Sequence, residues 1–192
     1  MPSDFYGWTA WDEIAHLCYF DETALLSAHD PERFAADARV LNERVAGGEE
    51  MSARSFATAR LTETWAHGQD IGDVLRRRRP ASNRLKHIAH LGVTTLGWTF
   101  VNRGLPVPPV SPYLFCLDAP DGSPWIWGDA ASPHQVLGSA QDFCLLVTQR
   151  RHVDDTALKY TPGSVSDWLH IAQCFAGLPA DGPRPGERKA VV

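Results

Sequence analysis

The segment "LPVPPVSP", residues 105–112, places four prolines within eight residues. Proline lacks a backbone N–H and its ring clashes with the preceding helical turn, so no helix continues through this stretch. Helix-like patterns precede the segment and strand-like patterns follow it. We therefore predict a domain boundary near residues 105–112, in a chain whose 192 residues and 44% hydrophobic content are sufficient to bury a core.

The residues before this boundary have the apolar spacing of helices. In "GWTAWDEIAHLCYFDETALLSAH", Thr9 and Asp12 have the spacing of a capping box at the start of the first helix. Asp30-Pro31 is typical of a helix start, and paired glycines after Val45 predict the end of the second helix. The predicted helices are about 10–28, 31–46, 52–79 (ended by Pro80) and 82–104, the last containing Gly92 and Gly97.

The part after the boundary mixes strands and helices. "YLFCLDAPDGSPWIWG" predicts a hairpin around an Asp-Gly turn, and "ALKYTP" a further short strand. "SAQDFCLLVTQRRH" and "SVSDWLHIAQCFAG" predict two helices opened by serine. We predict a mostly helical α+β protein with a helical domain over 1–104, a small α+β domain over 105–177 and a disordered tail over 178–192, where the apolar pattern ends.

Charge and composition exclude several classes of partner. The formal charge of −5 and the isoelectric point near 5.9 disfavour nucleic-acid binding, and we interpret Arg76 to Arg79 as a solvated helix end. No segment approaches the roughly 20 apolar residues of a membrane span, and the N-terminus lacks the pattern of a secretion signal. We expect a cytoplasmic protein whose four widely spaced cysteines are reduced core residues.

The stretch "TARLTETWAHGQD" spaces Arg60, Glu63, His67 and Asp70 three or four residues apart, along one face of a helix. A solvated helix face is one interpretation of this stripe. The other is a metal site, because a Glu and a His four residues apart can bind the same divalent ion. His16, within an otherwise apolar helix, is the best candidate for a third ligand.

The neighbouring polar residues have predicted roles in such a site. Asp70 and Asp12 lie one turn from His67 and His16, so either could accept a ring N–H and set the imidazole tautomer. Arg60 could orient Glu63 or hold an anionic substrate. Three ligands would leave a coordination position open to a substrate, as in catalytic metal sites.

At these residues the sequence resembles the DinB-like, mycothiol-dependent maleylpyruvate isomerase superfamily, and within it a branch of actinobacterial metal-binding proteins. The resemblance rests on "GWTAWDEIAH", with a GW turn before His16, and on "RLTETWAHGQD", which has the pattern R-x-x-E-x-x-x-H-x-x-D. It extends over most of residues 7–177 through "RLKHIAHLGV" and "DFCLLVTQRRH". It implies a helical bundle, a divalent metal, with zinc expected, bound by His16, Glu63 and His67, and a low-molecular-weight thiol as cosubstrate.

The chain departs from this family in length, because only fifteen residues precede His16 and only one modest helix lies between the first helix and Glu63. The predicted bundle is therefore shortened. A shortened bundle leaves an apolar face uncovered, which a second copy can cover, so we predict a homodimer. Of the other histidines, His87 and His90 are assigned a helix-surface or packing role, since no carboxylate adjoins them, and remain reserve ligands. His152 and His170 are assigned to a helix end and an interface.

Three functions are compatible with these features. The first is a metal-dependent enzyme with isomerase or thiol-transferase chemistry on a small organic substrate, in which Arg60 and Asp70 assist catalysis. The second is a metal-free tailoring enzyme of small-molecule biosynthesis, a cyclase or lyase that uses Glu63, His67 and Asp70 for acid–base catalysis. The third is a non-catalytic dimeric binding protein.

Overall fold

The structure is a computed structural model that describes residues 7–44, 53–108 and 113–188. The chain divides into two compact units, Met1–Val74 (unit 1) and Leu75–Val192 (unit 2). The predicted helical region 1–104 therefore includes unit 1 and the first helices of unit 2. Gly47, Gly48 and Ser52, at which we expected a helix end and a helix start, lie outside the described residues.

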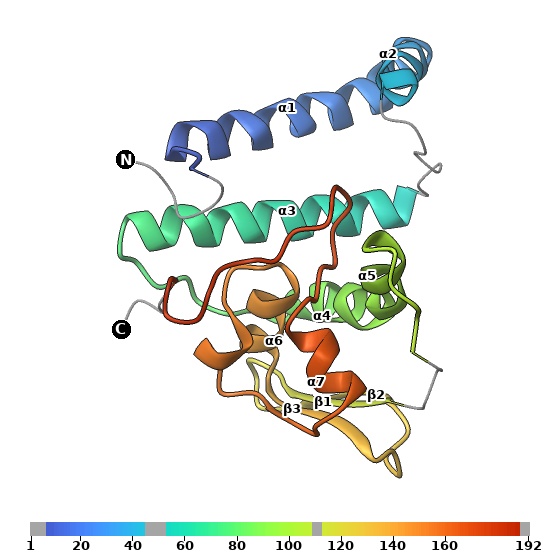
Figure 1. Cartoon of the computed structure of the whole chain (residues 1–192). Helices are drawn as coiled ribbons and strands as arrows, with labels where there is room; N and C mark the ends of the chain where they lie inside the picture. The colour runs from blue at the N-terminus through green and yellow to red at the C-terminus, as the bar shows by residue number, and fades with distance from the viewer. Residues whose placement is uncertain (1–6, 45–52, 109–112, 189–192) are drawn as a thin grey trace. The chain divides into compact units, whose positions relative to one another are not determined.

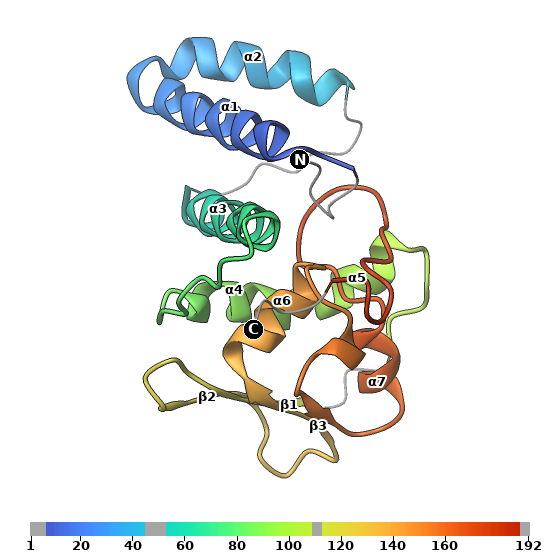
Figure 2. The ribbon, with the colours of Figure 1, turned by 90° about the vertical axis from the view of Figure 1, so that its left-hand side faces the viewer.

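The described residues of unit 1 form three helices, α1 (Ala10–His29), α2 (Pro31–Arg44) and α3 (Ala53–Val74). Helix α1 packs against both α2 and α3 (Figures 1 and 2). Contacts between α1 and α3 join increasing residue numbers on one helix to decreasing numbers on the other, so these two helices are antiparallel. This arrangement places the first half of α1 beside the second half of α3.

Local contacts and backbone conformation determine where α1 begins and where α3 ends. The predicted capping box is confirmed: the Asp12 N–H donates to Thr9 Oγ1 (3.3 Å), and the Thr9 N–H donates to Asp12 Oδ2 (2.8 Å). Helix α3 ends at Val74, before the predicted end at Pro80. The reason is Arg76, which has a φ of 50° and thus adopts the left-handed conformation that terminates helices.

Unit 2 contains a mixed sheet with the strand order β2-β1-β3-β4. Strands β1 and β2 form the predicted antiparallel hairpin, β1 and β3 are parallel, and β3 and β4 are antiparallel. Helices α4, α6 and α7 lie over one face of this sheet (Figure 1). The elements are α4 (Leu85–Thr94), α5 (Leu96–Asn102), β1 (Tyr113–Asp118), β2 (Pro124–Gly128), β3 (His134–Ser139), α6 (Ala140–Val147), the 3-10 turn η1 (Val153–Asp155), β4 (Lys159–Tyr160) and α7 (Ser164–Leu169).

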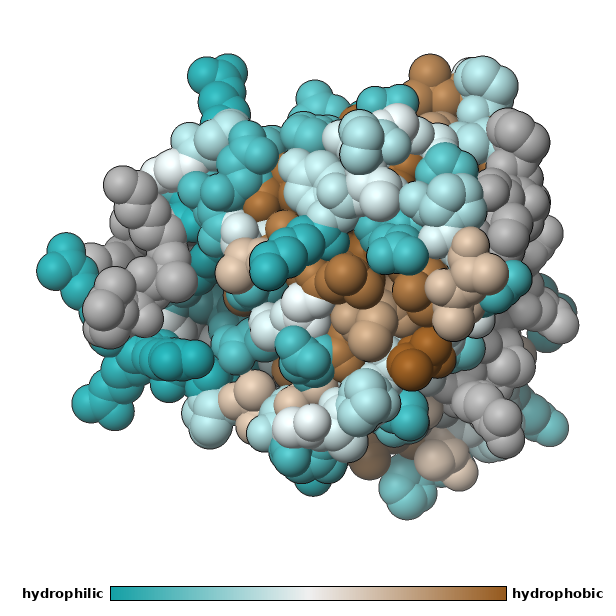
Figure 3. Space-filling view, turned by 90° about the horizontal axis from the view of Figure 1, so that it is seen from below, coloured by the Kyte–Doolittle hydropathy of each residue, from teal (hydrophilic) through white to brown (hydrophobic). Residues whose placement is uncertain are grey.

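An aromatic cluster forms the core between sheet and helices in unit 2. The Phe115 ring of β1 makes edge contacts with Phe143 of α6 (5.6 Å between ring centroids) and Trp168 of α7 (5.8 Å). The opposite face of the sheet is less covered: Ile126, which pairs with Cys116, is largely exposed. Figure 3 shows an apolar patch on the molecular surface seen from this side.

The α+β class is confirmed, with helices in the N-terminal part followed by a small mixed sheet with helices. The predicted fourth helix is two helices, because Thr95 Oγ1 donates to the Leu91 carbonyl (2.8 Å) and the backbone bends at Thr95. Strand β3 was not predicted, since its parallel pairing with β1 is a tertiary contact that "HQVLGS" does not indicate by itself. In the part of the chain that the structure describes, no helix is long and apolar enough to cross a membrane.

Residues 178–188, which we expected to belong to a disordered tail, make defined contacts within unit 2. The Gln149 amide donates to the Ala180 carbonyl (2.5 Å), and the Gly186 N–H donates to Asp155 (2.8 Å). Arg103 Nη1 pairs with Asp181 (2.8 Å). Polar groups of the folded unit bind this segment through hydrogen bonds and an ion pair. Such contacts leave no apolar pattern in the sequence, so they were not predicted.

Cysteine burial differs from the prediction at two positions. None of the four cysteines forms a disulfide bond, and Cys144 and Cys174 are buried as expected. Cys18, however, is exposed on α1, and Cys116 is partly exposed on the sheet. We predicted a core position for Cys18 because its neighbours in the sequence are apolar, but several of these neighbours are exposed as well.

Candidate functional site

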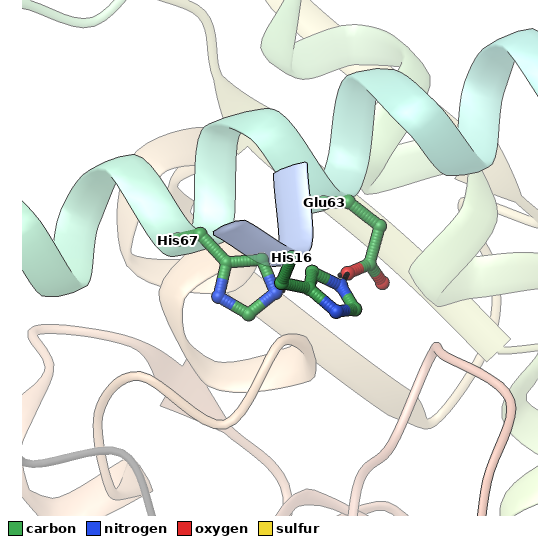
Figure 4. Close-up of side chains that lie close together, drawn as sticks. All are labelled: His16, Glu63 and His67. Carbon is green, nitrogen blue, oxygen red and sulfur yellow. Dashed lines mark hydrogen bonds and ion pairs between the residues drawn. The ribbon is translucent and has the colours of Figure 1, made fainter. Parts of the chain in front are cut away.

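Two helices bring the three predicted metal ligands together in unit 1. His16 comes from α1, and Glu63 and His67 from successive turns of α3. Glu63 Oε2 lies 3.1 Å from His16 Nε2 and 3.0 Å from His67 Nε2. The two imidazole rings are 4.6 Å apart between centroids and tilted by 57° (Figure 4). Both imidazoles thus converge on the same carboxylate oxygen.

The other nitrogen of His67 faces the interior of unit 1. His67 Nδ1 is in hydrogen-bond contact with Glu13 Oε2, and Asp70 Oδ2 lies 3.6 Å from the same nitrogen. The side chains of Glu13 and Asp70 are fully buried. Asp70 thus lies beside His67, but Glu13 is the carboxylate that is closer to Nδ1.

Sequence reasoning missed Glu13 as the partner of His67. Asp12, which we expected to support His16, instead caps α1 with Thr9. The sequence feature that points to Glu13 is its position one helical turn before His16. Glu63 likewise lies one turn before His67. Nothing in the sequence distinguishes Asp12 from Glu13 without the position of α3.

Trp8 lies against both imidazoles of the cluster. Its ring is stacked on His67, 5.7 Å away with an interplanar angle of 8°, and meets His16 edge-on at 5.3 Å. Gly7, with a φ of 76°, provides the left-handed turn that brings Trp8 back toward α1. The GW pair noted in the sequence is thus part of the candidate site.

Arg60 connects α3 to α1 one turn before Glu63. Its Nη2 donates to the Leu17 carbonyl (3.2 Å) and pairs with Asp21 (2.6 Å), and the guanidinium lies 5.5 Å from the Phe20 ring centroid. Its Nε and Nη1 are buried and have no hydrogen-bond partner among the described residues. Arg60 therefore retains donor capacity beside the site.

Glu63 remains ionised at neutral pH. Burial raises the pKa of its carboxyl group, but the hydrogen bonds from His67 and His16, together with the charges of the two imidazoles, outweigh burial and lower the pKa to about 2. An ionised carboxylate is the form that binds a metal ion.

Solvent exposure differs among the three candidate metal ligands. The side chains of His16 and Glu63 are 25% and 32% exposed, whereas that of His67 is 4% exposed. Glu13, His67 and Asp70 also meet the distance requirements for binding an ion, but that group is buried. The group His16, Glu63 and His67 could hold a metal and leave positions open on its exposed side.

His87 and His90, the predicted reserve ligands, are not part of any group with metal-binding geometry among the described residues. His90 Nδ1 accepts a hydrogen bond from Trp127 Nε1 (3.2 Å). This role is a packing one, as in the simpler interpretation of that histidine.

Comparison with known proteins finds relatives without an established function. No protein-family model matches the chain, and no solved structure matches it. Two curated proteins of Mycobacterium tuberculosis are each 37% identical to it over 225 aligned positions: "Uncharacterized protein MT0041" of strain CDC 1551 / Oshkosh and "Uncharacterized protein Rv0036c" of strain ATCC 25618 / H37Rv. Each alignment covers 94% of this chain and 87% of the relative.

The alignment is longer than the chain, so the relatives contain internal segments that this protein lacks. The similarity nevertheless extends over both units. The chain therefore belongs to the family that these two mycobacterial proteins represent.

Proposed function

We propose that the protein is a divalent-metal-dependent enzyme that acts on a small organic substrate, with His16, Glu63 and His67 as metal ligands. The observation that carries this proposal is the convergence of two imidazole Nε2 atoms, from two different helices, on one oxygen of Glu63. A solvated helix face, the alternative interpretation of the sequence, does not require His16 of α1 to meet that oxygen.

The distances from Glu63 Oε2 to the two imidazole nitrogens fit an ion. Ligands about 2.0 to 2.1 Å from a tetrahedral zinc ion lie roughly 3.3 Å from one another. The two nitrogen-to-oxygen distances of 3.1 and 3.0 Å are close to that value. Two imidazoles and one carboxylate are a donor set that suits zinc among the common divalent metals.

The charges around His67 also favour a cation. Three carboxylates, Glu13, Glu63 and Asp70, surround this one imidazole, and two of them are fully buried. Buried carboxylates cost free energy unless positive charge compensates them. A divalent ion bound at His67 Nε2 would add two positive charges beside these carboxylates.

Glu13 has a defined task in this proposal. By accepting the Nδ1–H of His67, it leaves Nε2, which faces Glu63, as the nitrogen that would give up its proton and bind an ion. Trp8 holds the same ring in place by stacking. His67 is therefore oriented from two sides before any ion binds.

The reaction we propose is isomerisation or thiol transfer, as the resemblance to the maleylpyruvate isomerase superfamily implies. A divalent ion, when bound, supplies Lewis-acid polarisation of a substrate heteroatom. The chain itself contributes Arg60, whose unpartnered donors suit an anionic group of the substrate, and Asp70, which supports His67. A low-molecular-weight thiol is the proposed cosubstrate.

The first test is the metal content of the purified, dialysed full-length protein, measured by elemental mass spectrometry. We expect roughly one tightly held ion per chain. His16→Ala, Glu63→Gln and His67→Ala should each lose it. His29→Ala is the matched control, because His29 is an exposed histidine at the other end of α1. Equal metal content in all five proteins would overturn the metal proposal.

A second test addresses the thiol. Cobalt-substituted protein is mixed with mycothiol, and the visible absorption of the cobalt ion is followed. A change in the spectrum that requires Glu63 and His67 supports thiol chemistry at this site. An unchanged spectrum with a bound ion would retain the metal site and reject the thiol.

The metal-free alternative uses the same contacts differently. In a protein without metal, Glu63 accepts hydrogen bonds from both imidazoles and Glu13 accepts one from His67, which is an arrangement suited to proton transfer in a cyclase or lyase. Absence of metal from the purified protein would favour this function. The non-catalytic binding protein is favoured if Glu63→Gln also leaves the binding of every tested small molecule unchanged.

We also propose that the protein is a homodimer in which α1 of one copy covers α1 of another. Trp11, Ile14 and Leu25 are exposed and share one side of α1 with exposed Cys18. Trp11 alone is 76% exposed. The relatives contain internal segments that this chain lacks, so a second copy is the proposed substitute for a missing cover.

A further inference from the structure

A second cluster of imidazole and carboxylate groups lies in unit 2. It consists of His152, which precedes η1, Asp154 within η1, and His170, which follows α7. One ligand atom from each of these residues lies within 4.8 Å of the others. We propose that His152, Asp154 and His170 form a second divalent-cation site, separate from the cluster between α1 and α3 and independent of the proposed function.

Two of the three side chains have the spacing of ligands of one ion. His152 Nδ1 and Asp154 Oδ2 are 3.5 Å apart, close to the spacing of about 3.3 Å between ligands of a tetrahedral zinc ion. The His152 and His170 rings meet edge-on at 5.5 Å between centroids, with 69° between their planes. His170 thus belongs to a different element from His152 and Asp154. The group is therefore formed by the tertiary structure and not by one turn of the chain.

His170 is oriented with a free nitrogen. Its Nδ1 lies 2.7 Å from the Ser166 carbonyl oxygen, which can only accept, so Nδ1 carries the proton. In the neutral ring, Nε2 then holds the lone pair. A metal-binding histidine is commonly fixed in this way by a backbone carbonyl.

His152 has its lone pair on the nitrogen near Asp154. The Asp154 N–H donates to His152 Nδ1 over 3.2 Å, so Nδ1 is the acceptor nitrogen of the neutral ring. An ion bound at Nδ1 would replace this one hydrogen bond and would also bind the adjacent carboxylate of Asp154. Both histidines therefore have the tautomer that metal binding requires.

A pocket adjoins the two histidines and contains an independent sign of a missing partner. Besides His152 and His170, Gln149 and Arg151 line this pocket. Gln149 is buried, and its Oε1 has no hydrogen-bond partner among the described residues, although its amide nitrogen donates to two carbonyls. Its φ of 59° is a strained conformation for glutamine. A buried oxygen without a partner is rare, so Gln149 Oε1 is a further acceptor near the two histidines that a bound ligand could satisfy.

The charges near the pocket leave the carboxylate of Asp154 available to a cation. Asp181 also lines the pocket, but its carboxylate pairs with Arg103 (2.8 Å). Asp155 accepts the Gly186 N–H. Arg151 donates to the Arg150 carbonyl (2.6 Å). Two imidazoles with one carboxylate select zinc, copper, nickel or cobalt over magnesium or calcium.

The test is a calorimetric titration of metal-stripped, full-length protein with Zn²⁺ at neutral pH. We expect two binding events in the wild-type protein. His170→Ala and Asp154→Asn should each remove one event and leave the other unchanged. Both residues are exposed, so these variants should retain the fold, which circular dichroism checks. His87→Ala, an exposed histidine of α4, is the control and should retain both events.

Glu63→Gln separates this proposal from the proposed function. It should remove the other binding event and leave the one that depends on His170. As an independent measurement, substoichiometric Cu²⁺ should broaden the ring-proton NMR signals of His152 and His170 before those of His87. The proposal is overturned if His170→Ala binds Zn²⁺ as the wild type does, or if His87 broadens first.

Discussion

Glu13 and His67 are 54 positions apart in the sequence, and the Glu13 carboxylate accepts a hydrogen bond from His67 Nδ1 in the buried interior of unit 1. This contact fixes the ring that is central to the candidate metal site. It also explains why a fully buried glutamate is found on a helix whose opposite side is solvated.

Glu13→Gln should weaken metal binding without removing a ligand. The amide keeps the size of the side chain but no longer provides the charged acceptor that sets the His67 tautomer. Loss of such a partner typically costs 10- to 100-fold in metal affinity, and we expect a weakening on the order of that range. Competition with a chromophoric chelator measures it. Glu22→Gln, at an exposed position of the same helix, should bind as the wild type does.

Thr9→Ala should destabilise unit 1 by about 1 kcal/mol through loss of the N-cap of α1. Urea denaturation followed by circular dichroism measures the loss. Hydrogen bonds from the Thr9 side chain and backbone lower the pKa of Asp12 from 3.8. The ionised carboxylate therefore stabilises the fold above its ordinary pKa, and this stabilisation is lost as the pH falls through the lowered value. An unchanged Asp12 pKa in the variant, measured by NMR, would contradict this account of the cap.

Alkylation of the native protein should separate the cysteines into two pairs. Cys18 is exposed and Cys116 partly exposed, so both should react with iodoacetamide at neutral pH. Burial, with a smaller contribution from the Cys174 thiol, raises the pKa of the Cys144 thiol, so little nucleophilic thiolate is present there. Cys144 and Cys174 should react only after denaturation. Peptide mass spectrometry identifies the sites, and early labelling of Cys144 would contradict the predicted order.

Alanine at two helical glycines should have opposite effects. A Cβ at Gly92 would lie 2.9 Å from Val147 and 3.0 Å from Phe143, both on α6. We expect a net loss of about 1 to 2 kcal/mol, because overpacking outweighs the better helix propensity of alanine. At Gly97 the nearest atom is 3.8 Å away, so Gly97→Ala should stabilise by about 0.5 to 1 kcal/mol. Chemical denaturation compares the two variants, and equal effects would reject the packing argument.

The double variant Trp11→Glu with Ile14→Glu should convert the proposed dimer into a monomer, because it places charges on the apolar side of α1. Light scattering after gel filtration gives the mass. Asp37→Lys changes an exposed position on a different helix, α2, and should remain dimeric. A monomeric wild-type protein would show that no second copy covers α1.

Much of the candidate site was predictable because its ligands follow helical spacing. Glu63 and His67 are four residues apart, and once α3 was predicted their side chains had to share a face. His16 was a weaker prediction, since it depended on α1 packing against α3. Glu13 was not predictable, because Asp12 and Glu13 are adjacent and only the rotation of α1 decides which of them points inward.

The same distinction applies to the whole chain. By itself, the sequence determined the helix starts at Thr9 and Ser139, the hairpin of β1 and β2 and the α+β class, because capping, turn chemistry and periodicity act between residues close in the chain. Only the tertiary structure decided the parallel pairing of β1 with β3, the contact of Glu13 with His67, and the meeting of His152 with His170. Those relationships depend on packing between distant segments, and local sequence patterns carry no information about the rotation and register that packing selects.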